Sequence, residues 1–209
     1  MSVSPATFVI DSKVNDYSVN PVQNKAIYDC LQNDFSYTKI LDMPMASLFD
    51  GTLESVDNSQ ITSLKDYALT QQSNLQSVVL PNCTSIGLSA CSFCERLSEV
   101  TAPKVSQLYE GAFMYCRMLE TVDFRDATNG AFIADQDGVY DSPFKFCFAL
   151  TDVWLGGDVW TIPSGLDASD VFDFIATDFK LHVPSDVLSD YQNDAQWSYL
   201  SDYMVGFSS

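Results

Sequence analysis

Apolar and polar positions alternate in a short pattern, L-x-x-V-x-φ, that recurs five times along the middle of the chain, with φ apolar in every copy but the first. The copies begin at Leu53, Leu75, Leu97, Leu119 and Leu150. The first three steps between copies are 22 residues long, and the alternation within each copy is that of a half-buried strand. A fixed period of this length, carried by strand-like segments, predicts a solenoid in which each repeat adds one strand to a parallel stack.

Positions outside these strands repeat in the same register. The residue eleven positions before each later leucine is apolar, and further columns follow it at fixed offsets. The first column holds Leu64, Ile86, Leu108 and Val139; the others hold Ala68, Ala90, Ala112 and Pro143, then Leu69, Cys91, Phe113 and Phe144, and finally Gln72, Cys94, Cys116 and Cys147. We expect these columns to form the buried core of the coil.

The step between the last two copies is 31 residues, nine longer than the others. The extra residues include Asn129-Gly130, an apolar run at 131–134, and Asp137-Gly138. Short apolar runs bounded by turn dipeptides of this kind are typical of β-hairpins. The sequence therefore predicts a small hairpin near residues 126–138 that projects from the stack.

A helix is expected before the repeats. Asn20 is a favourable N-cap and Pro21 a favourable first helical residue. The apolar residues that follow at helical spacing are Val22, Ala26, Ile27, Cys30 and Leu31. A helix of about three turns is too short to be stable alone, so we expect segment 1–34 to contact the solenoid or another subunit. Segment 35–52 is apolar enough to cap the open end of the stack.

The period fades after the last copy, and a C-terminal cap is expected there. Segments 159–163 and 179–184 have strand-like patterns and would add to the stack or to its edge. The predicted solenoid therefore spans residues 53–183, and the cap spans residues 184–209. The expected core anchors of the cap are Tyr191, Trp197 and Tyr199.

Charge excludes some classes of partner. The chain has 28 acidic and ten basic residues, which give a net charge of -18. Such a surface repels phosphate, which argues against a nucleic-acid or anionic-membrane partner. No apolar run approaches the roughly 20 residues of a membrane span. The N-terminus has neither a basic start nor an apolar stretch, so we expect no export signal and no membrane insertion.

The six cysteines, including the C-x-x-C pair Cys91 and Cys94, raise the question of disulfides or a zinc site. Their places in the repeat columns favour small buried core residues instead, and the single histidine, His182, is far from them in sequence. The acidic turn at 135–141 lacks the twelfth-position glutamate of a calcium loop. We therefore expect no metal, no cofactor and no enzymatic activity, with His182 exposed on a sheet face.

The strands themselves present the candidate binding surface. In each copy Leu, Val and the φ residue point inward, so the residues between them form two ladders on the outer face of the sheet. We expect this face to bind through Asp57, Val79, Glu99, Thr101, Thr121, Asp123, Asp152 and Trp154, with Ser55 and Ser77 beside them. Trp154 has two interpretations at this point: a binding aromatic for a sugar ring or a protein, or a side chain covered by the C-terminal cap or the hairpin.

The unit from Ile86 to Pro103 reads I-G-L-S-A-C-S-F-C-E-R-L-S-E-V-T-A-P. It is similar to the BspA-like class of bacterial leucine-rich repeats, whose units run I-G-x-x-A-F-x-x-C-x-x-L-x-x-I-x-L-P, and the unit at 108–119 fits as well. The resemblance implies an α/β leucine-rich-repeat solenoid. Its parallel β-strand stack would have a helix or irregular helical turn opposite, with caps at both ends.

The segment from Ser18 to Ile27 reads S-V-N-P-V-Q-N-K-A-I. It resembles the S-x-N-P-V-Q-N-K-x-I motif that recurs in head-fibre, tail-fibre and other appendage proteins of bacteriophages and prophages of gut bacteria. The resemblance implies a joint or oligomerisation element that precedes a displayed domain. Its expected contact residues are Asn20, Pro21, Val22, Asn24, Ile27 and Leu31.

Together the two resemblances imply a structural protein of the virion surface, assembled in the host cytoplasm. It would contact other virion proteins through its N-terminal segment, form a homotrimer, and bind a host surface glycan or protein through the solenoid. The alternative is an adhesin or interaction protein of the bacterial cell surface. A glycan-cleaving fibre is a third possibility, for which the sequence offers no identifiable pair of catalytic carboxylates.

Overall fold

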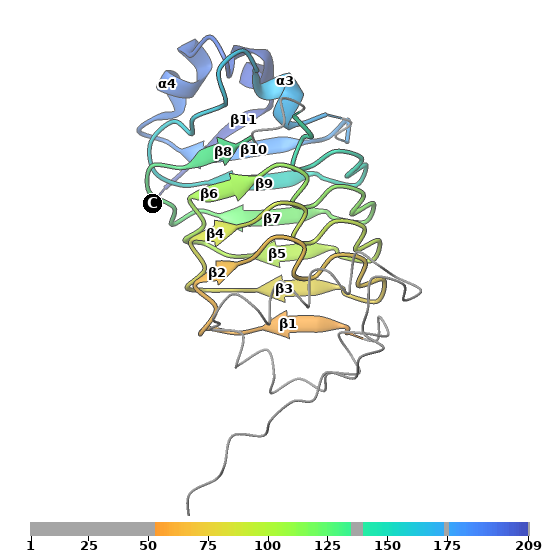
Figure 1. Cartoon of the computed structure of the whole chain (residues 1–209). Helices are drawn as coiled ribbons and strands as arrows, with labels where there is room; N and C mark the ends of the chain where they lie inside the picture. The colour runs from red at the N-terminus through yellow and green to blue at the C-terminus, as the bar shows by residue number, and fades with distance from the viewer. Residues whose placement is uncertain (1–52, 135–139, 174–175, 209) are drawn as a thin grey trace, which may run out of the picture.

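The computed structural model describes residues 53–134, 140–173 and 176–208. These residues form a coil of stacked rungs closed at one end by short helices (Figure 1). The repeat solenoid that the 22-residue period predicts is confirmed for this part of the chain. The predicted N-terminal helix, the six attachment residues and the 35–52 cap lie outside the described residues.

Within residues 53–134, 140–173 and 176–208, the larger sheet has seven parallel strands in the order β1-β3-β5-β7-β9-β10-β11. Their bounds are β1 (Ser55–Asp57), β3 (Ser77–Val79), β5 (Glu99–Thr101), β7 (Thr121–Phe124), β9 (Asp152–Leu155), β10 (Lys180–Pro184) and β11 (Met204–Phe207). The register matches the sequence period, because Val56 pairs with Val78, and Val78 with Val100. The strand predicted at 179–184 is therefore confirmed as β10, which lies between β9 and β11.

A second parallel sheet, which the sequence pattern did not reveal, forms another side of the coil. Its strands are β2 (Ser63–Leu64), β4 (Ser85–Ile86), β6 (Gln107–Tyr109) and β8 (Ala131–Ile133). Each strand turns one apolar side chain inward. The flanking residues are polar in β2, β4 and β6, where the Ser63 and Ser85 hydroxyls lie 2.7 Å apart, and apolar in β8. Strands of two or three residues are too short to show a period of two in the sequence.

The predicted projecting hairpin is wrong for residues 131–133. These residues form β8, the fourth rung of the second sheet, and Phe132 pairs with Leu108 in the buried column. Phe132 is 24 positions after Leu108, whereas Leu108 is 22 after Ile86, so two of the nine extra residues precede β8. Burying Phe132 in the continuing core removes more apolar area from water than an exposed hairpin would. Val139, which the sequence placed in this column, lies outside the described residues.

Turns rather than helices form the third side of each described repeat. Their amides alternate between two kinds of partner. The Ala68 amide donates to Lys65 within its own rung at 3.2 Å, and the Leu69 amide donates to Ala90 in the next rung at 2.7 Å. The same alternation recurs in later rungs and satisfies backbone groups that the coil would otherwise bury unpaired.

The cysteines occupy the core as the columns predict. Cys94, Cys116 and Cys147 are fully buried free thiols. Each thiol lies 3.0–3.1 Å from a carbonyl oxygen of the preceding rung, and each donates to it. Five cysteines lie in the described residues, and none of them forms a disulfide there.

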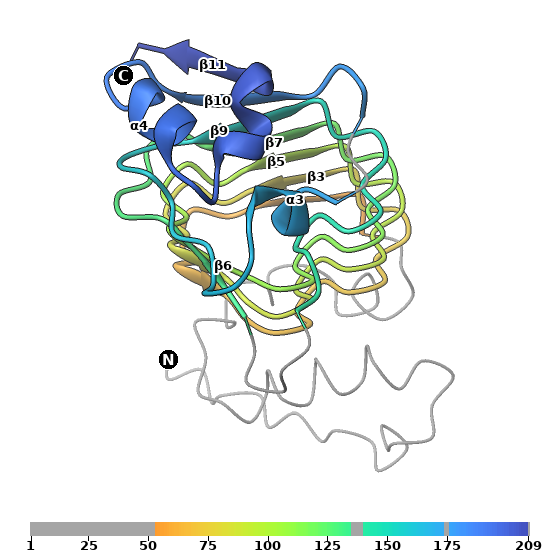
Figure 2. The ribbon, with the colours of Figure 1, turned by 90° about the horizontal axis from the view of Figure 1, so that it is seen from above.

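The C-terminal residues close the upper end of the coil. Figure 2 looks down on this end, where α3 (Ala168–Val171) and α4 (Leu188–Asn193) lie over the stack, and the 3-10 helix η2 (Ser198–Tyr203) leads into β11. The Trp197 indole N–H donates to the Trp160 carbonyl at 2.8 Å, and the Trp160 amide donates to the Tyr191 hydroxyl at 3.0 Å. Tyr191 and Trp197 are therefore core anchors as predicted, but Tyr199 is 66% exposed, and its predicted burial is wrong.

Replacing Gly130 with alanine should destabilise the fold, because the indole of Trp160 packs directly on this glycine. A Cβ at this position would lie 1.9 Å from Cε2 of the indole, and Trp160 is itself buried. We expect Gly130→Ala to lower the free energy of unfolding by about 1–3 kcal/mol, measured by chemical denaturation. Ser164→Ala, in an exposed turn, is the control and should change it by less than about 0.5 kcal/mol. Equal stability of the two variants would contradict this packing.

The buried thiols should be unreactive in the folded protein. Burial raises the pKa of Cys91, Cys116 and Cys147, so these thiols stay protonated at pH 8. They are unreactive because only the thiolate attacks a disulfide reagent. In a Cys30→Ser background, we expect a disulfide exchange reagent to modify none of the five described cysteines before unfolding. All five should react in concentrated guanidinium. Rapid labelling of any of them in the native protein would show that the coil opens locally.

Candidate functional site

The outer face of the seven-stranded sheet carries two ladders of side chains. A buried valine in β1, β3, β5, β7 and β9, and the buried Leu181 in β10, separates two outward positions, and parallel pairing places equivalent positions side by side. One ladder runs Ser55, Ser77, Glu99, Thr121, Asp152 and Lys180; the other runs Asp57, Val79, Thr101, Asp123, Trp154 and His182. The structure therefore brings all eight predicted binding residues together on one face.

The ladders end in a cluster of five side chains near the C-terminal cap, which we call the Trp154 cluster: Asp123, Arg125, Asp152, Trp154 and His182. The Arg125 guanidinium contacts the Asp123 carboxylate through Nε and Nη2, each at 2.8 Å from Oδ2. One rung further along, Nε2 of His182 lies 2.8 Å from Oδ1 of Asp152. The two carboxylates thus hold a guanidinium and an imidazole on either side of the tryptophan.

Trp154 is clamped between these two side chains. The His182 ring stacks on it with centroids 4.1 Å apart and planes 6° from parallel. The Arg125 guanidinium carbon lies 5.4 Å from the centroid of the indole, at cation–π distance. Because β9 lies between β7 and β10, these two contacts occupy opposite faces of the indole. Trp154 is half-buried, so its accessible part is the ring edge.

Of the earlier interpretations of Trp154, this arrangement disfavours stacking on a sugar ring and covering by a hairpin or the cap, and it leaves a contact with a protein. Its neighbours on the two ring faces come from the adjacent rungs of the sheet, not from a hairpin or from the cap helices. With both faces in contact with protein, the indole has no open face on which a sugar ring could stack. A ring edge beside carboxylates, an imidazole and a guanidinium instead matches the mixed polar and apolar contacts of a protein partner.

Sequence reasoning missed Arg125 and the role of His182. His182 faces outward as expected, but its side chain is only 16% exposed because Asp152 and Trp154 hold it. The step from β9 to β10 lies outside the 22-residue period, so the pairing of Trp154 with His182 could not be read from the repeats. The sequence signal for His182 was its alternation with Leu181 and Val183, which are buried.

Charge varies along the face. In the part of this face that the structure describes, acidic side chains recur at Asp57, Glu99, Asp123 and Asp152, and the basic side chains Arg125 and Lys180 lie toward the cap. Hydrogen bonding to Asp123 raises the pKa of Arg125, because the carboxylate stabilises the charged guanidinium. The face therefore presents a mostly acidic ladder that ends at a basic and aromatic cluster.

The described residues contain no group of three or more His, Cys, Asp or Glu side chains that could hold a metal ion. Nor does any helix in these segments combine the length and the apolar character needed to cross a membrane. The absence of enzymatic activity remains a prediction from the sequence.

Comparison with known proteins identifies the repeat type. Residues 10–129 match the BspA type leucine rich repeat region, in six copies. The match covers more than half of the chain and ends just before β8, whereas the structure continues the parallel stack through β9 and beyond. No curated protein matches the chain.

Removing the side chain of Arg125 or of His182 should expose one face of the Trp154 indole. Trp160 and Trp197 are each 1% exposed, so quenching of fluorescence by acrylamide reports mainly on Trp154. We expect Arg125→Ala and His182→Ala each to increase the quenching constant, and the double variant to increase it further. Lys180→Ala, on the neighbouring ladder, is the control and should leave quenching unchanged. Unchanged quenching in the double variant would mean that the clamp does not form in solution.

Proposed function

The chain belongs to the BspA-type leucine-rich repeat family, and from this we propose that it is a non-enzymatic recognition module that binds a partner protein through the outer face of its seven-stranded sheet. The observation that carries the proposal is the Trp154 cluster. Solenoids of stacked repeats commonly bind through such extended surfaces, because each rung adds side chains to a continuous face.

The cluster suits protein recognition because it is ordered before any partner arrives. Trp154 is fixed by His182 and Arg125, and these are fixed by Asp152 and Asp123. A rigid aromatic loses little conformational entropy on binding, and tryptophan and arginine are frequent among the residues that dominate binding energy. The acidic ladder below the cluster adds electrostatic selectivity and favours a partner with basic groups.

A protein partner fits this geometry better than a glycan. Aromatic recognition of sugars uses the open face of a ring, and both faces of Trp154 contact other side chains. Glycan binding would therefore require His182 or Arg125 to leave the indole and break its hydrogen bonds to a carboxylate.

The setting we propose is the surface of a bacteriophage or prophage virion, where the chain would be a head-fibre or tail-fibre type appendage that recognises the host. The support is the motif from Ser18 to Ile27, which resembles the joint segment of such appendages. In this setting segment 1–34 would attach the chain to other virion proteins and hold it as a homotrimer. Particle assembly in the host cytoplasm would then need no export signal.

The second candidate is an adhesin or interaction protein of the bacterial cell surface. The family match favours it, because BspA-like repeats are the shared feature of the chain and that class. Detection of the protein in purified phage particles would support the virion setting. Detection in the cell-surface fraction of a culture free of phage particles would overturn the virion setting in favour of the adhesin.

Substitution at Trp154 should weaken recognition if the outer face binds the host. We expect the full chain to be captured by a subset of intact gut bacteria, and Trp154→Ala to weaken capture roughly tenfold or more, as for a residue that dominates an interface. Tyr199→Ala, exposed on the C-terminal cap, is the matched aromatic control and should bind normally.

Pretreatment of the cells separates the two kinds of ligand. Protease treatment should remove the binding sites, whereas periodate oxidation of surface sugars should leave them intact. Loss of capture after periodate alone would replace the protein partner with a glycan. Equal capture by the wild-type chain and by Trp154→Ala would show that the outer face is not the binding surface.

A further inference from the structure

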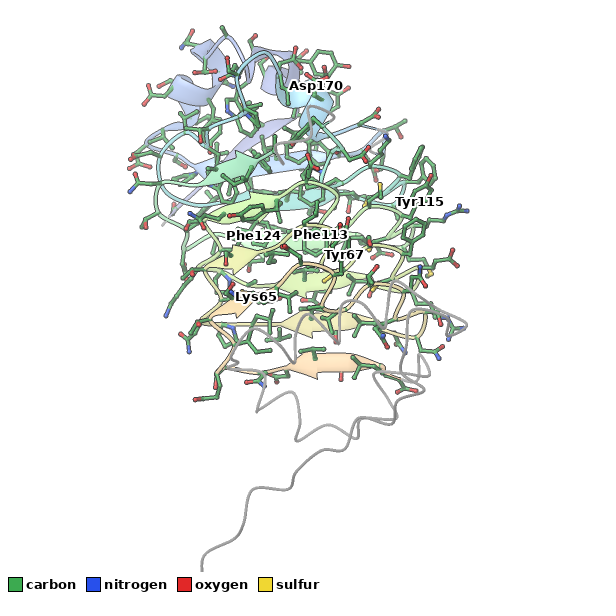
Figure 3. The ribbon with its side chains drawn as sticks, in the orientation of Figure 1. Lys65, Tyr67, Phe113, Tyr115, Phe124 and Asp170 are labelled. Carbon is green, nitrogen blue, oxygen red and sulfur yellow. The ribbon has the colours of Figure 1, made fainter. Side chains whose placement is uncertain are left out.

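The last strand of the seven-stranded sheet has an open edge. β11 pairs with β10 on one side, and within the described residues it has no strand on its other side. The coil itself is filled, because side chains such as Phe113 and Phe124 are fully buried in its interior (Figure 3). A partner therefore has to contact the outside of the coil or an edge of a sheet. The edge of β11 lies beside the Trp154 cluster, because Val205 pairs with His182.

Main-chain groups of β11 point away from β10 at this edge. In a parallel pair, alternate residues of a strand turn both their N–H and their C=O toward the same neighbour. Phe207 faces β10, because its carbonyl accepts from the Ser185 amide at 2.9 Å, so Gly206 faces the open side. The Met204 amide follows the same alternation and donates to the Ser201 carbonyl in η2. The Met204 carbonyl and both main-chain groups of Gly206 are thus directed to the open side.

Gly206 makes the edge accessible. It is partly exposed, and because glycine has no side chain, its exposed surface is main chain. A Cβ at this position would point toward the cap, 2.8 Å from the Ser185 hydroxyl oxygen and 3.4 Å from Cδ2 of Leu188 in α4. The inner side of Gly206 is therefore covered by protein. Its exposure comes from the outer side and from the edge itself.

β11 lacks residues of the kinds that usually protect a sheet edge. Protected edges often carry charged side chains or proline, which discourage the addition of another strand. The four residues Met204–Phe207 include neither. Val205 is 39% exposed and Phe207 is partly exposed, and alternation places both on the outer side of the sheet. A further strand would pack alternate side chains against these two.

The charge around this edge indicates what kind of strand would fit. The sequence from Leu181 to Ser209 contains four aspartates and no lysine or arginine. Three of these aspartates, Asp186, Asp190 and Asp202, are exposed. Two copies of this edge would therefore repel each other, whereas a segment that carries lysine or arginine would be attracted.

We propose that β11 is an acceptor edge, to which an extended basic segment of a partner protein adds as a further strand of the sheet. In this mode of recognition, main-chain hydrogen bonds supply affinity and alternate side chains supply specificity. Met204 and Gly206 would make the hydrogen bonds, and Val205 and Phe207 the apolar contacts. The inference rests on the proposed function only in assigning this segment to the protein that contacts the Trp154 cluster.

A short peptide of alternating lysine and valine is the probe that tests this edge. Its binding to the full chain is followed by hydrogen exchange of single amides in nuclear magnetic resonance spectra. We expect the peptide to slow exchange of the Gly206 amide and to leave the amide of Gly165, in an exposed turn, unchanged. The same peptide with every main-chain amide methylated keeps its charge but cannot donate hydrogen bonds, so it should not protect Gly206. A peptide of alternating glutamate and valine should not protect it either.

Two pairs of variants assign the binding to β11. Gly206→Pro removes the edge amide and should weaken binding of the lysine–valine peptide roughly tenfold, about the value of one hydrogen bond. Proline is tolerated in edge strands, so the chain should stay folded, which circular dichroism checks. Gly206→Ala adds a Cβ at the same place but keeps the amide, so it is the matched control and should bind normally. Val205→Lys should weaken binding by charge repulsion, whereas Val205→Thr should not.

Equal binding of the peptide by the wild-type chain and by Gly206→Pro would refute the acceptor edge, as would equal binding of the methylated peptide. A dimer of the wild-type chain that Gly206→Pro dissociates would also refute it, because a second copy would then occupy β11. Capture by cells separates this inference from the proposed function. If Trp154→Ala weakens capture and no peptide protects Gly206, the outer face remains the binding surface and the edge alone is excluded. Protection of Gly206 with full capture by Trp154→Ala would support the edge and exclude the outer face.

Discussion

The hydrogen bonds between successive rungs are the constraint on which the rest of the structure depends. Backbone groups in each rung bond to the next rung on all three sides of the coil. They do so through the strands of the larger sheet, through the strands of the second sheet, and through turn amides such as that of Leu69. Because these bonds join equivalent positions, every side chain lies beside its counterpart in the neighbouring rung. Core columns, surface ladders and stacked rings all follow from this one repetition.

The same constraint decides where the chain can vary. Nine extra residues enter between Leu119 and Leu150, yet Phe113 still donates its amide to Pro143, and Val122 still pairs with Val153. Two of the extra residues precede β8 and the others follow it, and β8 still pairs with β6. The stack is closed by Trp160 and Trp197, whose size fills the end that a further rung would otherwise cover.

The repeat columns were predictable because identical residues recur at a fixed offset, and inward and outward positions of the large sheet followed from alternation. The features that were predicted wrongly or missed depend on contacts between segments that the 22-residue offset does not relate. Asn129-Gly130 has the local preference of a hairpin, but the place of β8 is set by the apolar column that Phe132 completes. The clamp on Trp154 needed the pairing of β9 with β10, and the exposure of Tyr199 needed the packing of the cap. Sequence spacing carries no information about these.

The left-handed residues of the turns have a consequence for how the molecule could change in size. Each rung has the same corner geometry and adds about 4.8 Å along the axis of the coil. Gain or loss of one complete 22-residue unit would therefore lengthen or shorten the molecule without altering any corner. The outer ladders and the stacked rings of Phe93 and Tyr115 lie on different sides of the same rungs, so their lengths would change together. The number of rungs is thus a single variable that sets the reach of both surfaces.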